Sequence, residues 1–291
     1  MIDPHTRIGA VTLKVKNLAR METFYRQVVG LHLQKTAVGL VALGTPDETL
    51  VRLREVENGR FLPQATGLYH LALRVPTRAD LAHWLRHYAG KGAPHWQGGS
   101  NHGVSEALYL NDPEGNGIEI YCDQLGSQWQ VQADGQIAVF VHRLDVNALI
   151  REAPAAKWRQ LPPATDMGHV HFKVGDIDQT RHFYANLCGF QIKTAYQRSA
   201  LFVAAGDYHH HIGLNTWHSL GASPLPADGY GLAETEIWLN GRSAQQQLAA
   251  RLQAANWPVR TENGDLLVTD PSGIHLRFKH NQKNFEEKQH E

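Results

Sequence analysis

Cysteine is nearly absent from this chain of 291 residues, in which Cys122 and Cys188 are the only two. A disulfide framework is therefore not expected, and both residues are predicted to be small core side chains. The N-terminal stretch MIDPHTRIGAV also lacks the long apolar segment of a secretory signal. These absences together favour a reducing, cytoplasmic compartment.

The chain also has no excess of either charge, with 28 Lys+Arg against 28 Asp+Glu. Without a basic surface we predict no nucleic-acid partner and no attraction to anionic lipid. No apolar run approaches membrane-spanning length, so we expect no membrane span. The 42% of hydrophobic residues is ordinary for a globular protein that buries a sizeable core. Only the 18 histidines are unusual, and their positions must decide whether they are surface or site residues.

Internal repetition is the main feature that the chain does have. Residues 8–30 are similar to residues 167–189, and both predict an alternating strand, a turn and a helix that ends at a glycine. Residues 109–121 are similar to residues 267–279, and both predict two strands joined by an Asp-Pro-x-Gly turn. The sequence therefore predicts four strand–helix–strands units, at approximately residues 8–55, 67–122, 167–215 and 231–279.

Four such units resemble the vicinal oxygen chelate superfamily, and most closely its four-module members of the catechol 2,3-dioxygenase type. The most characteristic match is Asp-Pro-x-Gly-Asn-x-Ile-Glu at residues 112–119. The resemblance implies an α+β fold of four βαβββ modules, paired into two barrel-like, U-shaped mixed sheets. We predict modules one and two in residues 1–125, a partly structured connector in residues 126–164, and modules three and four in residues 165–291.

Alternation along three predicted strands places polar side chains opposite apolar ones. In GLYHLALRV, His70 faces away from Tyr69 and its apolar neighbours. In GHVHFKV, His169 and His171 share the polar face, and in GIEIY, Glu119 opposes two isoleucines. A single inward histidine is more often a structural residue than a ligand, so no one position decides the matter.

The resemblance implies a metal site, because ligands in this superfamily come from the first and last strands of two modules that share a cavity. Pairing module one with two, or three with four, leaves either set short of ligands. Pairing module two with three brings together His70, Glu119 and His169. Two histidines and one carboxylate favour non-haem Fe(II), with Mn(II), Zn(II) and Ni(II) as alternatives.

The other two modules carry different residues at the matching positions, namely Ala10, Glu234 and Arg277. An alanine cannot be a ligand, and an arginine would repel a cation. We therefore expect Glu234 and Arg277 to form an ion pair where a metal site has been lost.

Three further residues correspond to the catalytic residues of extradiol dioxygenases. Within the run His209-His210-His211, which we expect in a strand, the resemblance implies that His210 is the acid–base catalyst. His209 and His211 remain alternatives, because in a strand they would face opposite to His210. Tyr109, ten residues before the predicted carboxylate ligand, and His102 complete the set.

The implied function is extradiol ring cleavage of a catechol-type substrate by O2 in a metal-dependent enzyme, with homodimer formation compatible but not required. Trp96, Phe202 and Trp217 are candidates for an aromatic wall around a planar substrate. Two alternatives within the same fold are a glyoxalase-like lyase or isomerase and a non-enzymatic protein that binds small molecules. Glyoxalases normally use carboxylates from both modules, which module three does not offer here.

Overall fold

The computed structural model describes residues 1–280 and contains the four predicted βαβββ modules. Module one comprises β1 (Arg7–Val15), α1 (Leu18–Phe24), η1 (Tyr25–Val29), β2 (His32–Ala37), β3 (Leu40–Gly44) and β4 (Thr49–Glu55). Module two comprises β5 (Gly67–Arg74), α2 (Arg78–Gly90), β6 (Trp96–Asn101), β7 (Ser105–Asn111) and β8 (Gly117–Asp123).

The second half of the chain repeats this order of elements. Module three comprises β10 (Asp166–Lys173), α4 (Ile177–Arg181), η3 (His182–Leu187), β11 (Gln191–Tyr196), β12 (Ala200–Ala204) and β13 (Ile212–Asn215). Module four comprises β14 (Gly231–Leu239), α5 (Arg242–Ala254), β15 (Val259–Glu262), β16 (Asp265–Thr269) and β17 (His275–His280). The predicted modules are confirmed.

The first helices of modules one and three begin and end as their repeated sequence predicts. Asn17 and Asp176 are the N-caps, and each side chain accepts a hydrogen bond from a backbone N–H three residues later. Both helices continue as π-helical turns, η1 and η3. Gly30 and Gly189 follow with φ of 95° and 85°, a conformation that glycine adopts without a steric penalty.

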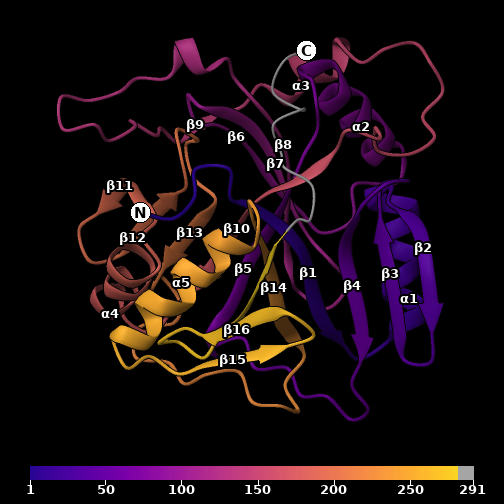
Figure 1. Ribbon diagram of the computed structural model, residues 1–291. Helices are drawn as coiled ribbons and strands as arrows, with labels where there is room; N and C mark the ends of the chain where they lie inside the picture. The colour runs from indigo at the N-terminus through magenta and orange to yellow at the C-terminus, as the bar shows by residue number, and fades with distance from the viewer. Residues whose placement is uncertain (281–291) are drawn as a thin grey trace.

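Two mixed sheets organise the molecule, and each takes its strands from both halves of the chain (Figure 1). Modules four and one form the first sheet, in the order β15-β16-β17-β14-β1-β4-β3-β2. Modules three and two form the second, in the order β11-β12-β13-β10-β5-β8-β7-β6-β9. The antiparallel pairs β1–β14 and β5–β10 join the modules at the centre of each sheet. The expected pairing of module two with module three is confirmed, while the division at residues 125 and 165 stays a prediction.

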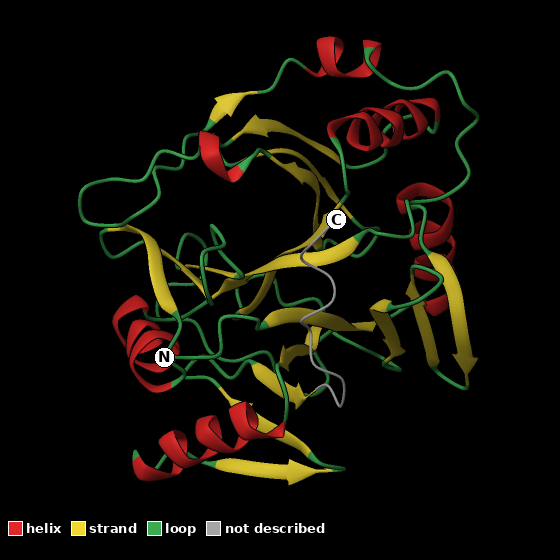
Figure 2. Cartoon of the chain, turned by 45° about the horizontal axis from the view of Figure 1, so that its top comes forward, coloured by secondary structure: helices red, strands yellow, loops and turns green. Residues whose placement is uncertain are grey.

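Helices cover the outer faces of the sheets (Figure 2), and the apolar side chains of the strands are buried. Leu71 of β5 and Val170 of β10 belong to the main core, as the alternation predicts. Trp84 of α2 is fully buried, and its indole N–H donates to the carbonyl of Val29, 3.0 Å away. This contact fixes the helix of module two against the helical end of module one.

Two equivalent hydrogen bonds tie one sheet to the other. The hydroxyl of Tyr25 in module one donates to Asp112 in module two, and that of Tyr184 in module three donates to Asp270 in module four, both at 3.1 Å. Each aspartate opens an Asp-Pro-x-Gly turn, and each tyrosine belongs to the repeated Phe-Tyr pair. Strand pairing thus joins modules within a sheet, and these bonds join modules between sheets.

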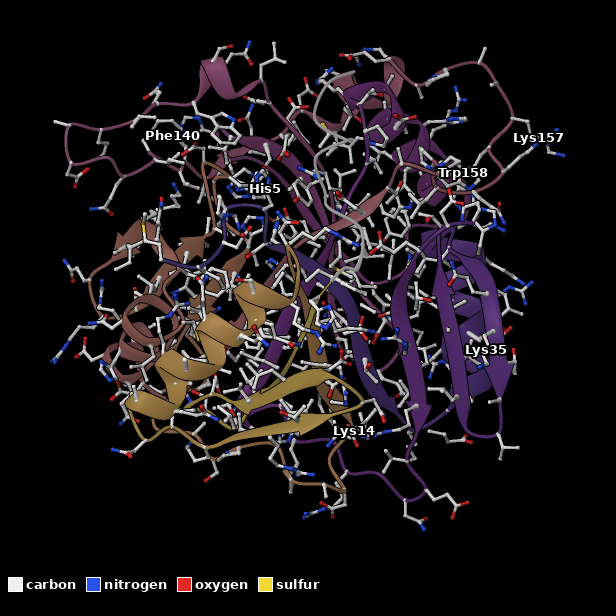
Figure 3. All side chains as sticks on the ribbon, in the orientation of Figure 1. His5, Lys14, Lys35, Phe140, Lys157 and Trp158 are labelled. Carbon is white, nitrogen blue, oxygen red and sulfur yellow. The ribbon has the colours of Figure 1, made fainter. Side chains whose placement is uncertain are left out.

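The connector between the halves is partly structured, as predicted. It contains η2 (Gly126–Gln128), β9 (His142–Arg143), which pairs with β6, and α3 (Val146–Arg151). Phe140 and Trp158 lie on opposite sides of the molecule in Figure 3, so the connector passes over module two between them. Trp158 stacks on His87 of α2, with ring centroids 4.9 Å apart. Within residues 1–280, no helix combines the length and apolar character needed to cross a membrane.

Candidate metal centre

Three side chains converge on the second sheet from three neighbouring strands. His70 comes from β5, Glu119 from β8 and His169 from β10. Oε2 of Glu119 lies 3.1 Å from Nε2 of His70 and 3.2 Å from Nε2 of His169. Their potential ligand atoms all lie within 4.8 Å of one another, so one ion could contact all three.

The hydrogen bonding of this group is incomplete in a way that fits a metal ion. All three side chains are buried, with His70 7%, Glu119 2% and His169 2% exposed. Nε2 of His70 has no partner with hydrogen-bond geometry among the described residues, although it lies close to the carboxylate. Buried polar atoms without partners are costly, and a cation between the three groups would satisfy them. The donor set therefore fits a non-haem metal with open coordination positions.

Protonation states also suit a metal site. Burial opposes ionisation of Glu119, but His169 and His70 outweigh it, and the pKa of this carboxyl lies well below its usual range. Burial lowers the pKa of His169, which keeps that imidazole neutral at neutral pH. A carboxylate and a neutral imidazole are the forms in which these side chains bind metals.

A cavity of about 1030 Å³ opens over the three residues. Phe202 and Trp217 line it, as predicted, whereas Trp96 lies partly exposed beside Tyr88 instead. Tyr69 was predicted to face the core but lines the cavity. The strand pairing skips this residue, because His171 pairs with His70 and the next residue, Phe172, pairs with Leu68. The resulting bulge turns the tyrosine ring to the other face of the sheet.

We predicted that the three consecutive histidines lie in a strand. This prediction is wrong, because they lie in the turn between β12 and β13. Alternation therefore does not decide their directions. His210 lines the cavity, with its ring centroid 4.3 Å from that of His169. His209 is fully buried behind it, and Nδ1 of His211 accepts a hydrogen bond from the N–H of Ala205. Of the three candidates, only His210 reaches the cavity.

Tyr109 and His102 form a hydrogen-bonded pair at the cavity wall. Nδ1 of His102 donates to the carbonyl of Phe140 at 2.7 Å, so its Nε2 accepts from the hydroxyl of Tyr109 at 2.8 Å. Burial and then the Glu119 carboxylate raise the pKa of Tyr109 well above its usual range. The tyrosine therefore stays protonated beside the candidate metal site.

Comparisons with known proteins agree with this geometry. The sequence profile of the Glyoxalase/Bleomycin resistance protein/Dioxygenase superfamily matches residues 7–120. The chain is 36% identical to the catechol-2,3-dioxygenase of Bacillus subtilis (strain 168) over 282 residues, which cover 95% of this chain and 98% of that relative. The chain belongs to this superfamily.

Solved structures of the superfamily share the fold. A Bacillus subtilis subsp. subtilis str. 168 protein described as a candidate dioxygenase has a TM-score of 0.60 at 15% identity, covering 97% of this chain and 87% of that one. Glyoxalase I from Zea mays has a TM-score of 0.53 at 14% identity, with coverages of 94% and 92%. At such identities the likeness concerns the fold and not the activity.

The superfamily's repeated architecture makes the first sheet a second potential site, but it holds an ion pair. Nε of Arg277 lies 2.8 Å from Oε1 of Glu234, which confirms the predicted pair. The guanidinium also contacts Glu262 and Asp265, at 2.9 and 3.3 Å. Ala10 is buried close by and offers no ligand atom. The positive charge of Arg277 thus lies in the first sheet at the position that corresponds to the candidate metal site of the second sheet.

Sequence reasoning gave no function to several residues of the cavity wall. Nε2 of His171 lies 2.9 Å from the side-chain amide of Asn215, which holds the ring in place. Tyr196 and Lys173 also line the cavity. Alternation had indicated the direction of His171 and Lys173, whereas nothing in the sequence placed Tyr196 there.

Proposed function

We propose that this protein is an extradiol ring-cleaving dioxygenase that acts on a catechol-type substrate at a mononuclear Fe(II) site. The observation that carries the proposal is the convergence of His70, Glu119 and His169 at a cavity that also contains His210 and Tyr109. The relative named catechol-2,3-dioxygenase, which matches nearly the whole chain, supports the same reaction class.

The metal ligands in this proposal are His70, Glu119 and His169. Three protein ligands would hold the ion and would leave some of its coordination positions open to substrates. When bound, iron supplies the electron transfer between catechol and O2, and the protein supplies geometry and proton transfer. The cavity wall presents aromatic rings, including Phe202 and Trp217, to a planar substrate.

Proton transfer is assigned to His210. Burial, and then the neighbouring histidines, lower its pKa well below the usual range, so its imidazole enters the reaction neutral. A neutral imidazole in the cavity can accept the proton of a catechol hydroxyl and return it later. Tyr109, held by His102, would donate a hydrogen bond to an oxygen on which negative charge develops.

The ligand set favours this reaction over a glyoxalase-type one. Among residues 1–280, the group of potential ligands contains one carboxylate, Glu119, and two histidines. A glyoxalase-type site would need a second carboxylate from module three. The turn before β13 supplies His210 in the cavity instead.

The test is metal analysis followed by oxygen consumption. Protein purified without chelator and loaded anaerobically with Fe(II) should bind one equivalent of iron. On addition of catechol it should consume one O2 per catechol and form a yellow ring-cleavage product. Iron bound without oxygen consumption on a panel of substituted catechols would overturn the proposal. Conversion of a hemithioacetal, without oxygen, would point to the glyoxalase-like alternative.

A further inference from the structure

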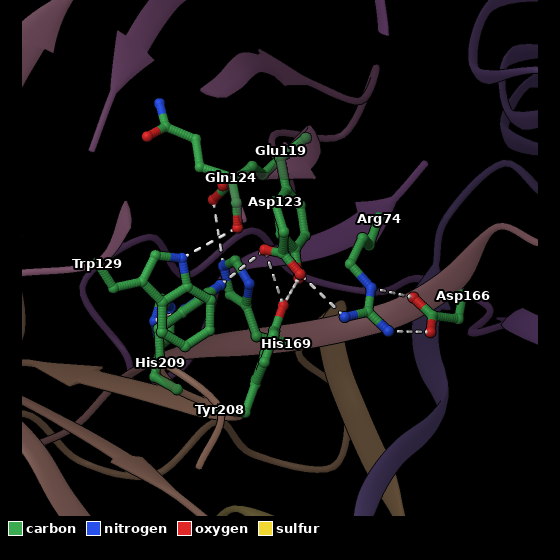
Figure 4. A network of polar contacts seen from close by, with 11 residues as sticks. Arg74, Glu119, Asp123, Gln124, Trp129, Asp166, His169, Tyr208 and His209 are labelled. Carbon is green, nitrogen blue, oxygen red and sulfur yellow. Dashed lines mark hydrogen bonds and ion pairs between the residues drawn. The ribbon is translucent and has the colours of Figure 1, made fainter. Parts of the chain in front are cut away.

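A chain of charged groups lies directly behind the candidate metal centre (Figure 4). Asp123, the last residue of β8, accepts a hydrogen bond from Nη1 of Arg74 at 2.9 Å. The same guanidinium forms two further bonds to Asp166, at 3.0 and 2.6 Å. Burial raises the pKa of Asp123, but His209 and Arg74 outweigh it, and the pKa lies below the ordinary value. Asp123 is therefore a carboxylate, which can only accept hydrogen bonds.

His209 connects this carboxylate to the cavity. Its Nε2 lies 2.9 Å from Oδ1 of Asp123, and its ring has no exposed surface. The ring is packed between Tyr208 and Trp129, with centroids 4.1 and 5.3 Å away. Figure 4 shows Trp129 and Tyr208 beside His209, and these contacts hold the orientation of the buried ring.

The direction of each hydrogen bond follows from the carboxylate. Because Asp123 only accepts, Nε2 of His209 carries a hydrogen, and in the tautomer whose single ring hydrogen is there Nδ1 has a lone pair. That Nδ1 lies 2.8 Å from Nδ1 of His210. Two nitrogens at this distance share one hydrogen, which must come from His210. A neutral His210 then has its lone pair on Nε2, at the far side of the ring from His209.

We propose that Asp123 and His209 are positioning residues that hold His210 as the tautomer with hydrogen on Nδ1, so that Nε2 presents a lone pair to the substrate. The inference rests on the proposed function for the identity of that substrate. During proton transfer a catechol O–H bond breaks, an N–H bond forms at Nε2, and the electron pair stays on the catechol oxygen. The charge that His210 gains is stabilised through His209 by the carboxylate.

The neighbouring histidine does not share this arrangement. His211 is also buried, but its Nδ1 accepts from the N–H of Ala205 and makes no bond to Asp123. His211 is therefore a matched control for a change at His209, because both are buried rings in the same turn.

The first experiment reads the tautomer directly. Long-range ¹H–¹⁵N correlation spectra of the full-length chain, with diamagnetic Zn(II) added, distinguish a ring nitrogen that carries hydrogen from one that does not. In the unmodified protein, His210 should have hydrogen on Nδ1 at neutral pH. Hydrogen on Nε2 would overturn the proposal, whatever the activity.

Variants then separate positioning from packing. In His209→Asn, the amide oxygen lies close to where Nδ1 of histidine lies and can still accept from His210, so the tautomer should be kept. His209→Leu has no acceptor, and His210 should become a mixture of tautomers. His211→Leu should leave the tautomer of His210 unchanged. A mixture in His211→Leu, or an unchanged tautomer in His209→Leu, would contradict the assignment.

Kinetics of the Fe(II)-loaded chain complete the test. His209→Leu removes both the fixed tautomer of His210 and the link to the Asp123 carboxylate that stabilises its charge, so kcat should fall on the order of 100-fold with little change in KM. His209→Asn should keep at least about a tenth of the kcat of the unmodified protein, because its amide oxygen can accept the hydrogen bond from His210. If no catechol is consumed while the tautomer is as described, the proposed function fails and the positioning stands. If the protein cleaves the ring but His210 has its hydrogen on Nε2, the positioning proposal fails and the proposed function stands.

Discussion

The two sheets are built from the same repeated module, yet among residues 1–280 only the second forms a group that could hold a metal. Their strand registers correspond, since Glu119 lies beside Ala72 in the second sheet as Arg277 lies beside Glu236 in the first. The residues differ at all three matching positions. Where the second sheet has His70, His169 and Glu119, the first sheet has Glu234, Ala10 and Arg277, respectively. The fold therefore tolerates either a site for an ion or a built-in cation at the same place.

The comparison also explains why the ion pair is stable where it lies. Arg277 is surrounded by three carboxylates, from Glu234, Glu262 and Asp265. In the second sheet the single carboxylate of Glu119 faces two imidazoles, and no arginine or lysine side chain contacts it among the described residues. The difference teaches that a few side chains, rather than the backbone, decide which sheet could bind a metal ion.

The largest expected effect comes from removing a ligand in the second sheet. Mutation of a residue that hydrogen-bonds to a metal ligand typically weakens metal binding about 10- to 100-fold. His70→Ala removes a predicted ligand itself and should weaken metal binding by more than that. The reason is that two protein ligands remain where three were present. Metal content after gel filtration, measured by mass spectrometry, gives the result.

The matching residue of the first sheet provides the control for this variant. Glu234→Ala changes the corresponding strand position, and the protein should keep its full metal content. Full occupancy in His70→Ala, or loss of metal in Glu234→Ala, would show that the two sheets have been assigned the wrong way round.

A smaller effect is expected from breaking the ion pair of the first sheet. Arg277→Leu leaves three carboxylates without their shared cation and should lower the free energy of unfolding by about 1–2 kcal/mol, between the values for exposed and buried pairs. Metal content should not change. Urea unfolding of the two proteins measures the difference, and an unchanged midpoint would mean that the pair contributes nothing to stability.

The smallest expected effects concern the two hydrogen bonds between the sheets. Tyr25→Phe and Tyr184→Phe should each destabilise the protein by about 0.5–1.5 kcal/mol, because each removes one of several hydrogen bonds to a buried carboxyl. Tyr184→Phe should cost slightly more than Tyr25→Phe, because Asp112 keeps a further hydrogen bond from the side-chain amide of Asn116, whereas Ile274 at the matching place has no side-chain donor for Asp270. A larger cost for Tyr25→Phe in chemical unfolding would show that Asn116 does not compensate for the lost hydroxyl.

These two variants should also respond to pH in a defined direction. Burial raises the pKa of Asp112 and of Asp270 from 3.8 to about 6, against the hydrogen bonds that they accept. A raised folded-state pKa stabilises the protein below the unfolded value, and this contribution is lost as pH rises through the folded value. Loss of the tyrosine hydrogen bond raises the pKa further, so both variants should be destabilised more at about pH 7 than at about pH 5. Equal destabilisation at the two pH values would contradict this account.

The convergence of the three candidate ligands could be predicted because strand alternation gave the direction of each side chain and the family resemblance showed which positions to compare. His70, Glu119 and His169 lie on strands whose apolar faces are clear, and the repeat showed which positions correspond. The pairing of modules followed from the chemistry of the available ligands. The fold was predictable for the same reasons, since turn and helix signals recur at fixed places in each module.

What sequence reasoning missed depends on turns and on long-range contacts. The direction of Tyr69 is set by a bulge, which alternation does not reveal. The histidine run was expected in a strand because the family resemblance implies one there, but it lies in a turn. Asp123 and His209 are 86 residues apart, and no local pattern marks them as partners. Such a contact becomes visible only when the strands are placed side by side.

The strand pairing between distant modules also affects how the protein is made. When a ribosome has finished modules one and two, β1 and β5 both lack the partners that β14 and β10 later provide. Unpaired edges of this kind are prone to pair with other chains, and folding must wait for the second half. The nascent first half therefore needs protection from aggregation, and a first half expressed alone should be poorly soluble. A single chain of this design reaches its native state only near the end of translation.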